Sequence, residues 1–234
     1  TRLTINNKFI EGQKYVKLLG VWLQQDGGWG KHVSETCKKA YMRMSFLTKL
    51  RYAGVTRTDL ILNYKQFVRT VLEYCSVAFH SSLTLAQSDS LERCQAVALR
   101  VILQDDYESY DSALILTGLE KLFSRRTARC LDFSLKCTKH EQNQRFFPKN
   151  PNLGSGSDVR DQEEFTVNFA RTKQYSESAI PYCQRLLNQH VRDEQARDRD
   201  RVAEGAGAAP GARRGEEEGA GAGRGAGAGG GDGG

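Results

Sequence analysis

The first part of the chain alternates apolar and polar positions with the two-residue period of β-strands. Leu3 and Ile5 stand between polar residues, and segment 8–10 resumes the extended pattern after an Asn-Asn turn signal. The run 15–23 is rich in β-branched and aromatic residues, which indicates one buried or half-buried strand. We therefore expect strands over residues 2–23.

From His32 onward the apolar positions recur three and four residues apart, which is the period of an amphipathic helix. Four such stripes follow one another. The second runs as one wide stripe from Leu60 to Phe79, which predicts a central helix with several neighbours. Because short connections place consecutive helices antiparallel, the pattern predicts a mainly α-helical bundle. The helices are expected to begin near His32, at a capping box of Thr56 and Asp59, near Thr84, and after Gly118.

Composition divides the chain further. A stretch rich in Pro, Gly, Ser and Asn predicts a linker, and the alternation over 165–169 predicts a strand before a last helix from Ser178. The Gly/Ala-rich end cannot bury enough apolar surface to order itself. The expected parts are a β-strand remnant (1–30), a helical bundle (31–147), a linker (148–164), a strand and helix segment (165–202) and a disordered tail (203–234). The start at Thr1, inside apparent strand sequence, indicates a fragment of a larger protein.

The formal net charge is +6, although the tail from Gly205 carries slightly more acidic than basic residues. The positive surplus therefore belongs to the part that is expected to fold, and it favours a polyanionic partner such as nucleic acid. No apolar run approaches the length of a bilayer span, so a membrane partner is not expected.

Six cysteines occur, none of them in a CxxC pair, which fits buried reduced thiols of an intracellular protein better than a disulfide framework. Cys130, Cys137 and His140 match no common zinc spacing, so no metal ligands are predicted. The adjacent pair Asp105-Asp106 could hold divalent ions, but it follows a helical run, where a helix stop explains it. Phosphate-binding glycine loops and metalloprotease or serine hydrolase motifs are absent. No catalytic residue is predicted.

Two basic stretches offer a binding chemistry. Lysines and arginines on a helix surface neutralise phosphates without reading sequence. An ordinary solvated face is the alternative interpretation. The candidate nucleic-acid-binding residues are Lys31, Lys38, Lys39, Arg43, Lys49, Arg51, Arg125 and Arg126.

Several short segments also share an order and spacing with a known family. They are 18–21 with Trp29 and His32, then Lys39-Ala40, 69–75, 91–93, 98–100, Leu119-Glu120 with Arg125-Arg126, and Tyr175, Ser178, Ile180-Pro181 and Leu187-Asn188. In this order they resemble the end of the palm and the start of the thumb in reverse transcriptases of non-LTR retrotransposons of the LINE-like and jockey-like kinds.

The resemblance implies that Leu19, Gly20 and Val21 are similar to the primer-grip element, and that the following helices are a thumb. The thumb would hold the backbone of an RNA–DNA or DNA duplex beside the upstream palm and fingers of the parent protein. Leu18 departs from the aromatic residue that is usual in the family. The aromatic-Ala-Asp-Asp turn that would bind Mg²⁺ is absent from this sequence. We therefore expect no cofactor and no polymerase activity in this chain.

A second hypothesis remains open. The bundle could be a non-enzymatic protein-interaction module with an incidental basic face. The helical segment that precedes the dioxygenase of alkylation-repair proteins looks broadly similar, although nothing here supplies that enzyme's iron site.

Overall fold

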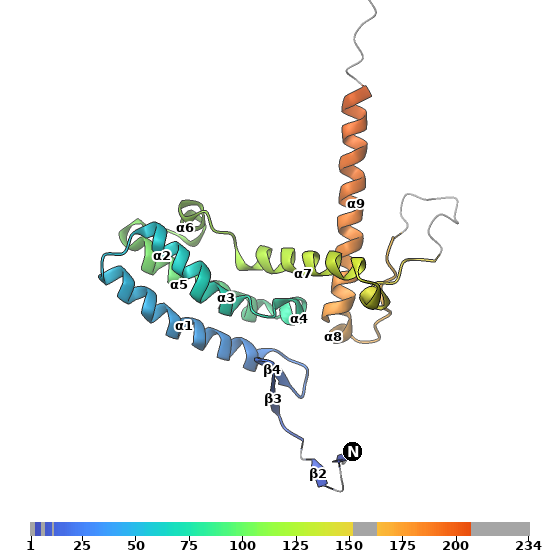
Figure 1. Ribbon diagram of the computed structural model, residues 1–234, viewed down its shortest axis with the longest axis horizontal. Coiled ribbons are helices and arrows are strands. Elements are labelled where there is room, and N and C mark those ends of the chain that lie inside the picture. The colour runs from blue at the N-terminus through green and yellow to red at the C-terminus, as the bar shows by residue number, and fades with distance from the viewer. Residues whose placement is uncertain (1–2, 6–7, 11, 152–162, 207–234) are drawn as a thin grey trace, which may run out of the picture. The chain divides into compact units, whose positions relative to one another are not determined.

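The computed structural model describes residues 3–5, 8–10, 12–151 and 163–206. The described chain is mainly helical, with short antiparallel strands at its start, as the periodicity predicts (Figure 1). Described residues up to Asp193 belong to one compact unit, and those from Glu194 onward to a second.

The strands form two separate hairpins. β1 (Leu3–Ile5) pairs with β2 (Lys8–Ile10), and β3 (Tyr15–Leu18) pairs with β4 (Val21–Gln24), both antiparallel. The prediction of one strand over 15–23 is therefore wrong. Leu19 and Gly20 both adopt positive φ, 46° and 86°, and form a two-residue turn of the kind that reverses a twisted ribbon. The Asn-Asn turn signal lies outside the described residues.

The first helix matches its predicted stripe. α1 (Gly30–Tyr52) buries Val33, Ala40 and Leu47 along one side. The chain then reverses through Gly54, and Thr56 caps α2 (Arg57–Asn63) by accepting a hydrogen bond from the backbone N–H of Asp59, as the predicted capping box requires.

The wide second stripe is not a single helix. After α2 the backbone widens into a π-helical segment, η1 (Tyr64–Val68), continues as α3 (Arg69–Leu72), and stops before α4 (Ser76–Phe79). Cys75, at φ 56°, causes the break, because a left-handed residue cannot continue a right-handed helix. Because the helix axis changes direction between these segments, the apolar residues of the stripe pack against several different helices. The prediction of one long helix from Leu60 to Phe79 is therefore wrong.

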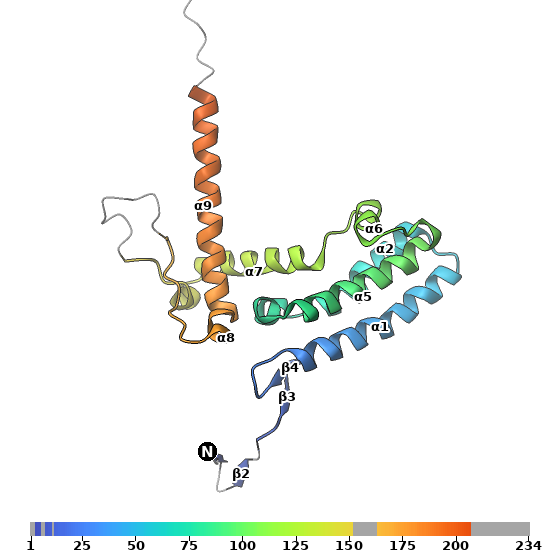
Figure 2. The same cartoon turned by 180° about the vertical axis from the view of Figure 1, so that it is seen from behind.

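Further helices complete the bundle. After η2 (His80–Ser82) come α5 (Leu85–Leu103), η3 (Gln104–Asp106), α6 (Tyr110–Thr117) and α7 (Leu122–Lys139). Thr84 and Gln87 form a capping box at the start of α5. The segments from α2 to α4 run back along α1, and α5 then runs beside α1 in its direction, so consecutive segments are antiparallel as predicted (Figures 1 and 2). The main apolar core lies among these helices.

A second apolar cluster lies where α7 meets Phe147, Phe165 and α9 (Ala179–Ala206). η4 (Glu141–Phe146) and α8 (Lys173–Ser176) lie between α7 and α9 in the chain. The predicted strand at 165–169 is replaced by extended chain with one isolated bridge between Lys149 and Phe165. Asn188 of α9 donates to the Phe165 carbonyl and accepts from its N–H, both at 2.9 Å, so a side-chain amide occupies the place of a partner strand. α9 continues to Ala206, past the expected start of the tail at Ala203. Residues 207–234 lie outside the described residues.

All six cysteines are free, and Cys94, Cys130, Cys137 and Cys183 are buried, which confirms the expected burial for these four. Cys37 is partly buried, whereas Cys75 is exposed. Within the described ranges, no helix has both the length and the apolar character that crossing a membrane requires.

Candidate nucleic-acid interface

α1 concentrates positive charge. It carries six of the predicted contact residues and a single acidic residue, Glu35. At about 100° per residue, Lys39 and Arg43 fall on the flank that faces α3, whereas Lys38 and Lys49 point away from the buried stripe. The six cations therefore occupy two adjoining sides of one helix and do not form a single row. They are Lys31, Lys38, Lys39, Arg43, Lys49 and Arg51.

Two of these cations are engaged by the acidic residue. Glu35 accepts from Lys31 at 3.1 Å and from Lys38 at 3.0 Å. Hydrogen bonds from Lys38 and then Lys31 hold the pKa of Glu35 below its ordinary value. Such surface pairs contribute little to stability, so these lysines can exchange Glu35 for a phosphate at small cost.

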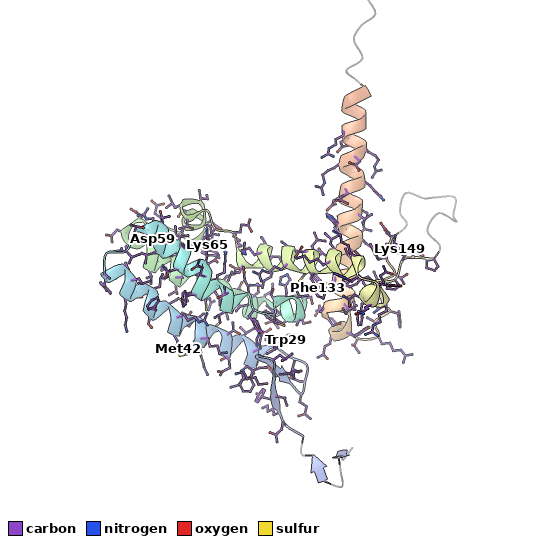
Figure 3. The ribbon with its side chains drawn as sticks, viewed as in Figure 1. Trp29, Met42, Asp59, Lys65, Phe133 and Lys149 are labelled. Carbon is purple, nitrogen blue, oxygen red and sulfur yellow. The ribbon has the colours of Figure 1, made fainter. Side chains whose placement is uncertain are left out.

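The other four form no ion pair with any carboxylate of the described residues. Arg51 lies over the ring of Tyr52, 4.3 Å from its centroid, at the end of the helix. Lys49 is exposed on the outer side of α1, the side on which Figure 3 shows Met42 pointing away from the bundle. Lys39 and Arg43 line a cleft.

This cleft, of about 390 Å³, lies between α1, the β3–β4 turn and α3. Its positive groups are Lys39 and Arg43, and its lining contains no acidic residue. Three hydroxyls lie beside the two cations, but those of Thr70 and Tyr74 donate to the carbonyl oxygens of Gln66 and Leu19. Phosphate oxygens accept from cations and from hydroxyls, so the donors that the cleft offers them are Lys39, Arg43 and Thr36. The lining residues are Gly20, His32, Thr36, Lys39, Arg43, Thr70, Val71 and Tyr74.

The β3–β4 turn forms one wall of this cleft. The hydroxyl of Tyr74 donates to the carbonyl oxygen of Leu19 at 2.8 Å. A Cβ on Gly20 would meet the Tyr74 ring at 3.3 Å, so the ring lies directly against the turn. The Leu19 side chain is 83% exposed, while Val21 is buried. The structure thus brings Gly20 together with two of the predicted basic residues.

Neighbouring groups fix the positions of the cleft's polar side chains. Arg43 donates from Nη1 to the carbonyl oxygen of Phe67 at 2.5 Å, which holds the guanidinium between α1 and η1. His32 is buried, and its Nδ1 accepts from the backbone N–H of Trp22 at 3.4 Å. Burial, and then the charge of Lys39, lower the pKa of His32. The imidazole is therefore neutral at pH 7 and adds no charge to the cleft.

The second basic stretch, which lies within residues 121–139, has a different role from the one predicted. Arg125 and Arg129 bind the carboxylate of Glu73, which is 2% exposed, at 2.5 and 3.0 Å. Lys121 pairs with Asp111, and Lys136 pairs with Asp132. The pairs with Glu73 and Asp111 tie the start of α7 to its surroundings, whereas the Lys136–Asp132 pair lies within α7. Arg125 is thus largely committed to an internal carboxylate.

Arg126 requires a correction. It was expected on a basic surface, but its exposed fraction is 0%, so it cannot reach a phosphate in this structure. Its Nε donates to Nδ1 of His80 at 3.3 Å, and its Nη2 donates to Ser88 at 2.9 Å. The reason is its position on the buried stripe of α7, four residues after Leu122 and four before Cys130.

The hydroxyl-bearing residues of the cleft, Thr36, Thr70 and Tyr74, were not among the predicted site residues. A signal existed for Thr36, because it precedes Lys39 and Arg43 by three and seven residues on one helix side. The other two could not be assigned, because only the tertiary fold brings α3 against this part of α1.

Among the described residues, no three His, Cys, Asp or Glu side chains are placed together to hold a metal ion. The Asp105-Asp106 pair lies in η3 after α5, where Asp106 forms an ion pair with Arg57. This is the helix stop that the sequence indicated. Comparisons with protein-family models, curated proteins and solved structures give no match to this chain.

Proposed function

We propose that the bundle binds the sugar–phosphate backbone of double-stranded nucleic acid through α1 and the adjoining cleft. The observation that carries the proposal is the cleft itself, where Lys39 and Arg43 lie beside three hydroxyls and no carboxylate. Such a site suits phosphate contacts, which position a duplex without reading its bases.

Together with the resemblance stated above, this supports a thumb-like role in an RNA-directed DNA polymerase. In such a protein the reacting carboxylates, with their Mg²⁺, would belong to a palm segment that this sequence does not contain. The chain would hold the template–primer duplex and would carry out no nucleotidyl transfer alone.

The proposal is tested by fluorescence anisotropy with the full chain and a labelled RNA–DNA hybrid. We expect binding that weakens steeply with salt, because each phosphate contact contributes about 0.9 to the slope of log affinity against log salt. The double variant Lys39→Glu/Arg43→Glu should lose most of the affinity and reduce that slope by about 2.

A matched control is Lys136→Glu/Lys139→Glu, which makes the same change of charge on α7. Equal losses in both double variants would show that only net charge matters and would remove the assignment to the cleft. Absence of binding at low salt would refute the proposal as a whole.

A protein partner is the second candidate function, and one observation favours it. The β3–β4 hairpin exposes Val16, Leu18, Leu19 and Leu23. Exposed neighbouring apolar residues commonly mark a contact with another protein surface. In a thumb this contact would be the upstream palm, whereas in an interaction module it would be a separate protein. The Lys39→Glu/Arg43→Glu variant distinguishes the two, since it should not disturb a contact made by the hairpin.

A further inference from the structure

An exposed aromatic pair adjoins the basic cleft. The rings of Phe46 on α1 and Phe67 on η1 lie with their centroids 5.9 Å apart at an interplanar angle of 41°. Their residues are 47% and 50% exposed, and Met42, one turn before Phe46, is also exposed. Large apolar side chains are usually buried, so two contacting rings left open to solvent require an explanation.

The same surface contains a cation of the cleft. Arg43 precedes Phe46 by three residues, a rise of about 4.5 Å along α1. Its guanidinium donates to the carbonyl oxygen of Phe67, so it is held at the base of the second aromatic residue. A fixed guanidinium and two half-exposed rings therefore lie side by side, and the hydroxyl-lined cleft continues beyond them.

The charge of this surface favours a polyanion over a protein or a lipid surface. Glu35, the only acidic residue of α1, lies eleven residues before Phe46 and is occupied by two lysines. Lys49 is exposed one turn after Phe46 and forms no ion pair with a described carboxylate. The rings are thus bordered by Lys39, Arg43 and Lys49.

Paired bases inside a duplex present only their edges to a protein. Contacts to the duplex backbone therefore do not require exposed aromatic rings. Unpaired bases expose their flat faces and stack on aromatic side chains next to cations that neutralise their phosphates. Arg43 donates to the backbone of Phe67, so a nucleotide with its phosphate at Arg43 would have its base next to the ring pair.

We infer that Phe46 and Phe67 bind an unpaired nucleotide of a single-stranded extension, whose phosphate lies at Lys39 and Arg43 in the adjoining cleft. This deepens the proposed function, on which it rests. It specifies the preferred ligand as a duplex with a single-stranded end.

The test compares two labelled duplexes with the full chain, one blunt and one extended by a short run of thymidines. We expect the extended duplex to bind at least about five-fold more tightly, since a stacked base contributes that much or more. Phe46→Ala/Phe67→Ala should abolish this preference and leave affinity for the blunt duplex unchanged. The control, Tyr52→Ala/Phe133→Ala, removes two exposed rings from other places and should retain the preference.

A second measurement does not depend on the alanine variant being folded. In the variant Phe46→Trp, the added indole fluorescence should be quenched by the extended duplex and not by the blunt one. Blunt and extended duplexes binding equally to the wild-type chain would overturn the inference and leave the backbone grip intact, whereas no binding of either would overturn both. A preference that persists in a folded Phe46→Ala/Phe67→Ala variant would also overturn it.

Discussion

Tyr74 and Leu19 are 55 residues apart in the chain, and the hydroxyl of Tyr74 donates to the carbonyl oxygen of Leu19 at 2.8 Å. Leu19 is held at φ 46°, a conformation that non-glycine residues rarely adopt. The hydrogen bond therefore attaches a strained turn to the end of α3, and it completes one wall of the basic cleft.

Tyr74→Phe should loosen this turn. Loss of one partly exposed hydrogen bond lowers the free energy of unfolding by about 1 kcal/mol. Hydrogen exchange should increase at Val21 and Trp22 more than in α5. Tyr52→Phe is the control, at an exposed tyrosine whose hydroxyl makes no hydrogen bond with the described residues. Equal exchange in both variants would contradict a role for Tyr74 in holding the hairpin.

Gln95 should be a larger determinant of stability. Its Oε1 accepts from Tyr64 at 2.5 Å, and its Nε2 donates to the Tyr110 hydroxyl at 2.8 Å and to the Glu120 carbonyl at 2.9 Å. Gln95→Leu would leave the buried Tyr64 hydroxyl without its acceptor, whereas the Tyr110 hydroxyl would keep Glu92 at 2.5 Å. The change should lower the free energy of unfolding by about 1–3 kcal/mol in urea titration. Gln66→Leu, at an exposed position, should change it little.

His80 should make stability depend on pH. Burial, and then the charge of Arg126, lower the pKa of His80 from 6.5 to about 4. The folded state therefore favours the neutral ring, and the unfolded state takes up the proton first. The resulting stabilisation is complete above pH 6.5 and is lost as pH falls to about 4, by about 3 kcal/mol in all.

Urea titrations between pH 7 and pH 4 measure this loss, and His80→Gln serves as the comparison. The difference in stability between the two proteins should shrink across that window. A constant difference would show that His80 has the same pKa in both states.

Arg126→Met should show that the buried charge of Arg126 does not contribute to nucleic-acid binding. Because Arg126 contacts only neutral groups directly and its burial lowers its own pKa, replacing it should change the free energy of unfolding by no more than about 2 kcal/mol. Affinity for a duplex should stay unchanged. Arg43→Met, by contrast, should weaken binding and lower the free energy of unfolding by only about 1 kcal/mol, through its exposed hydrogen bond to Phe67. Anisotropy and urea titration of both variants check this pair of outcomes.

Periodicity was sufficient to predict the fold class because α1, α5 and α7 each bury a continuous stripe. It failed wherever the backbone changes direction at an unusual residue. Leu19 and Cys75 adopt left-handed conformations without being Gly or Asn, so Gly20 alone signals the hairpin and the break before α4 has no local signal. Tertiary contacts determine these positions.

The site was partly predictable. Clustered cations on a helix surface identified Lys39 and Arg43, but the cleft also needs Thr70 and Tyr74 from α3, which only the fold brings there. The burial of Arg126 is predictable from the sequence, because its four-residue spacing from Leu122 and Cys130 places it on the buried side of α7.

The pairing of Asn188 with Phe165 has a consequence for solubility. The extended chain at Phe165 has a helix amide where a neighbouring strand would be, so both of its peptide groups are satisfied within the monomer. Shortening that amide, as in Asn188→Ala, would leave the buried N–H and carbonyl oxygen of Phe165 without partners beneath α9. Local opening would then uncover this edge, and free edges pair with copies of themselves, so the amide of Asn188 protects the chain against self-association.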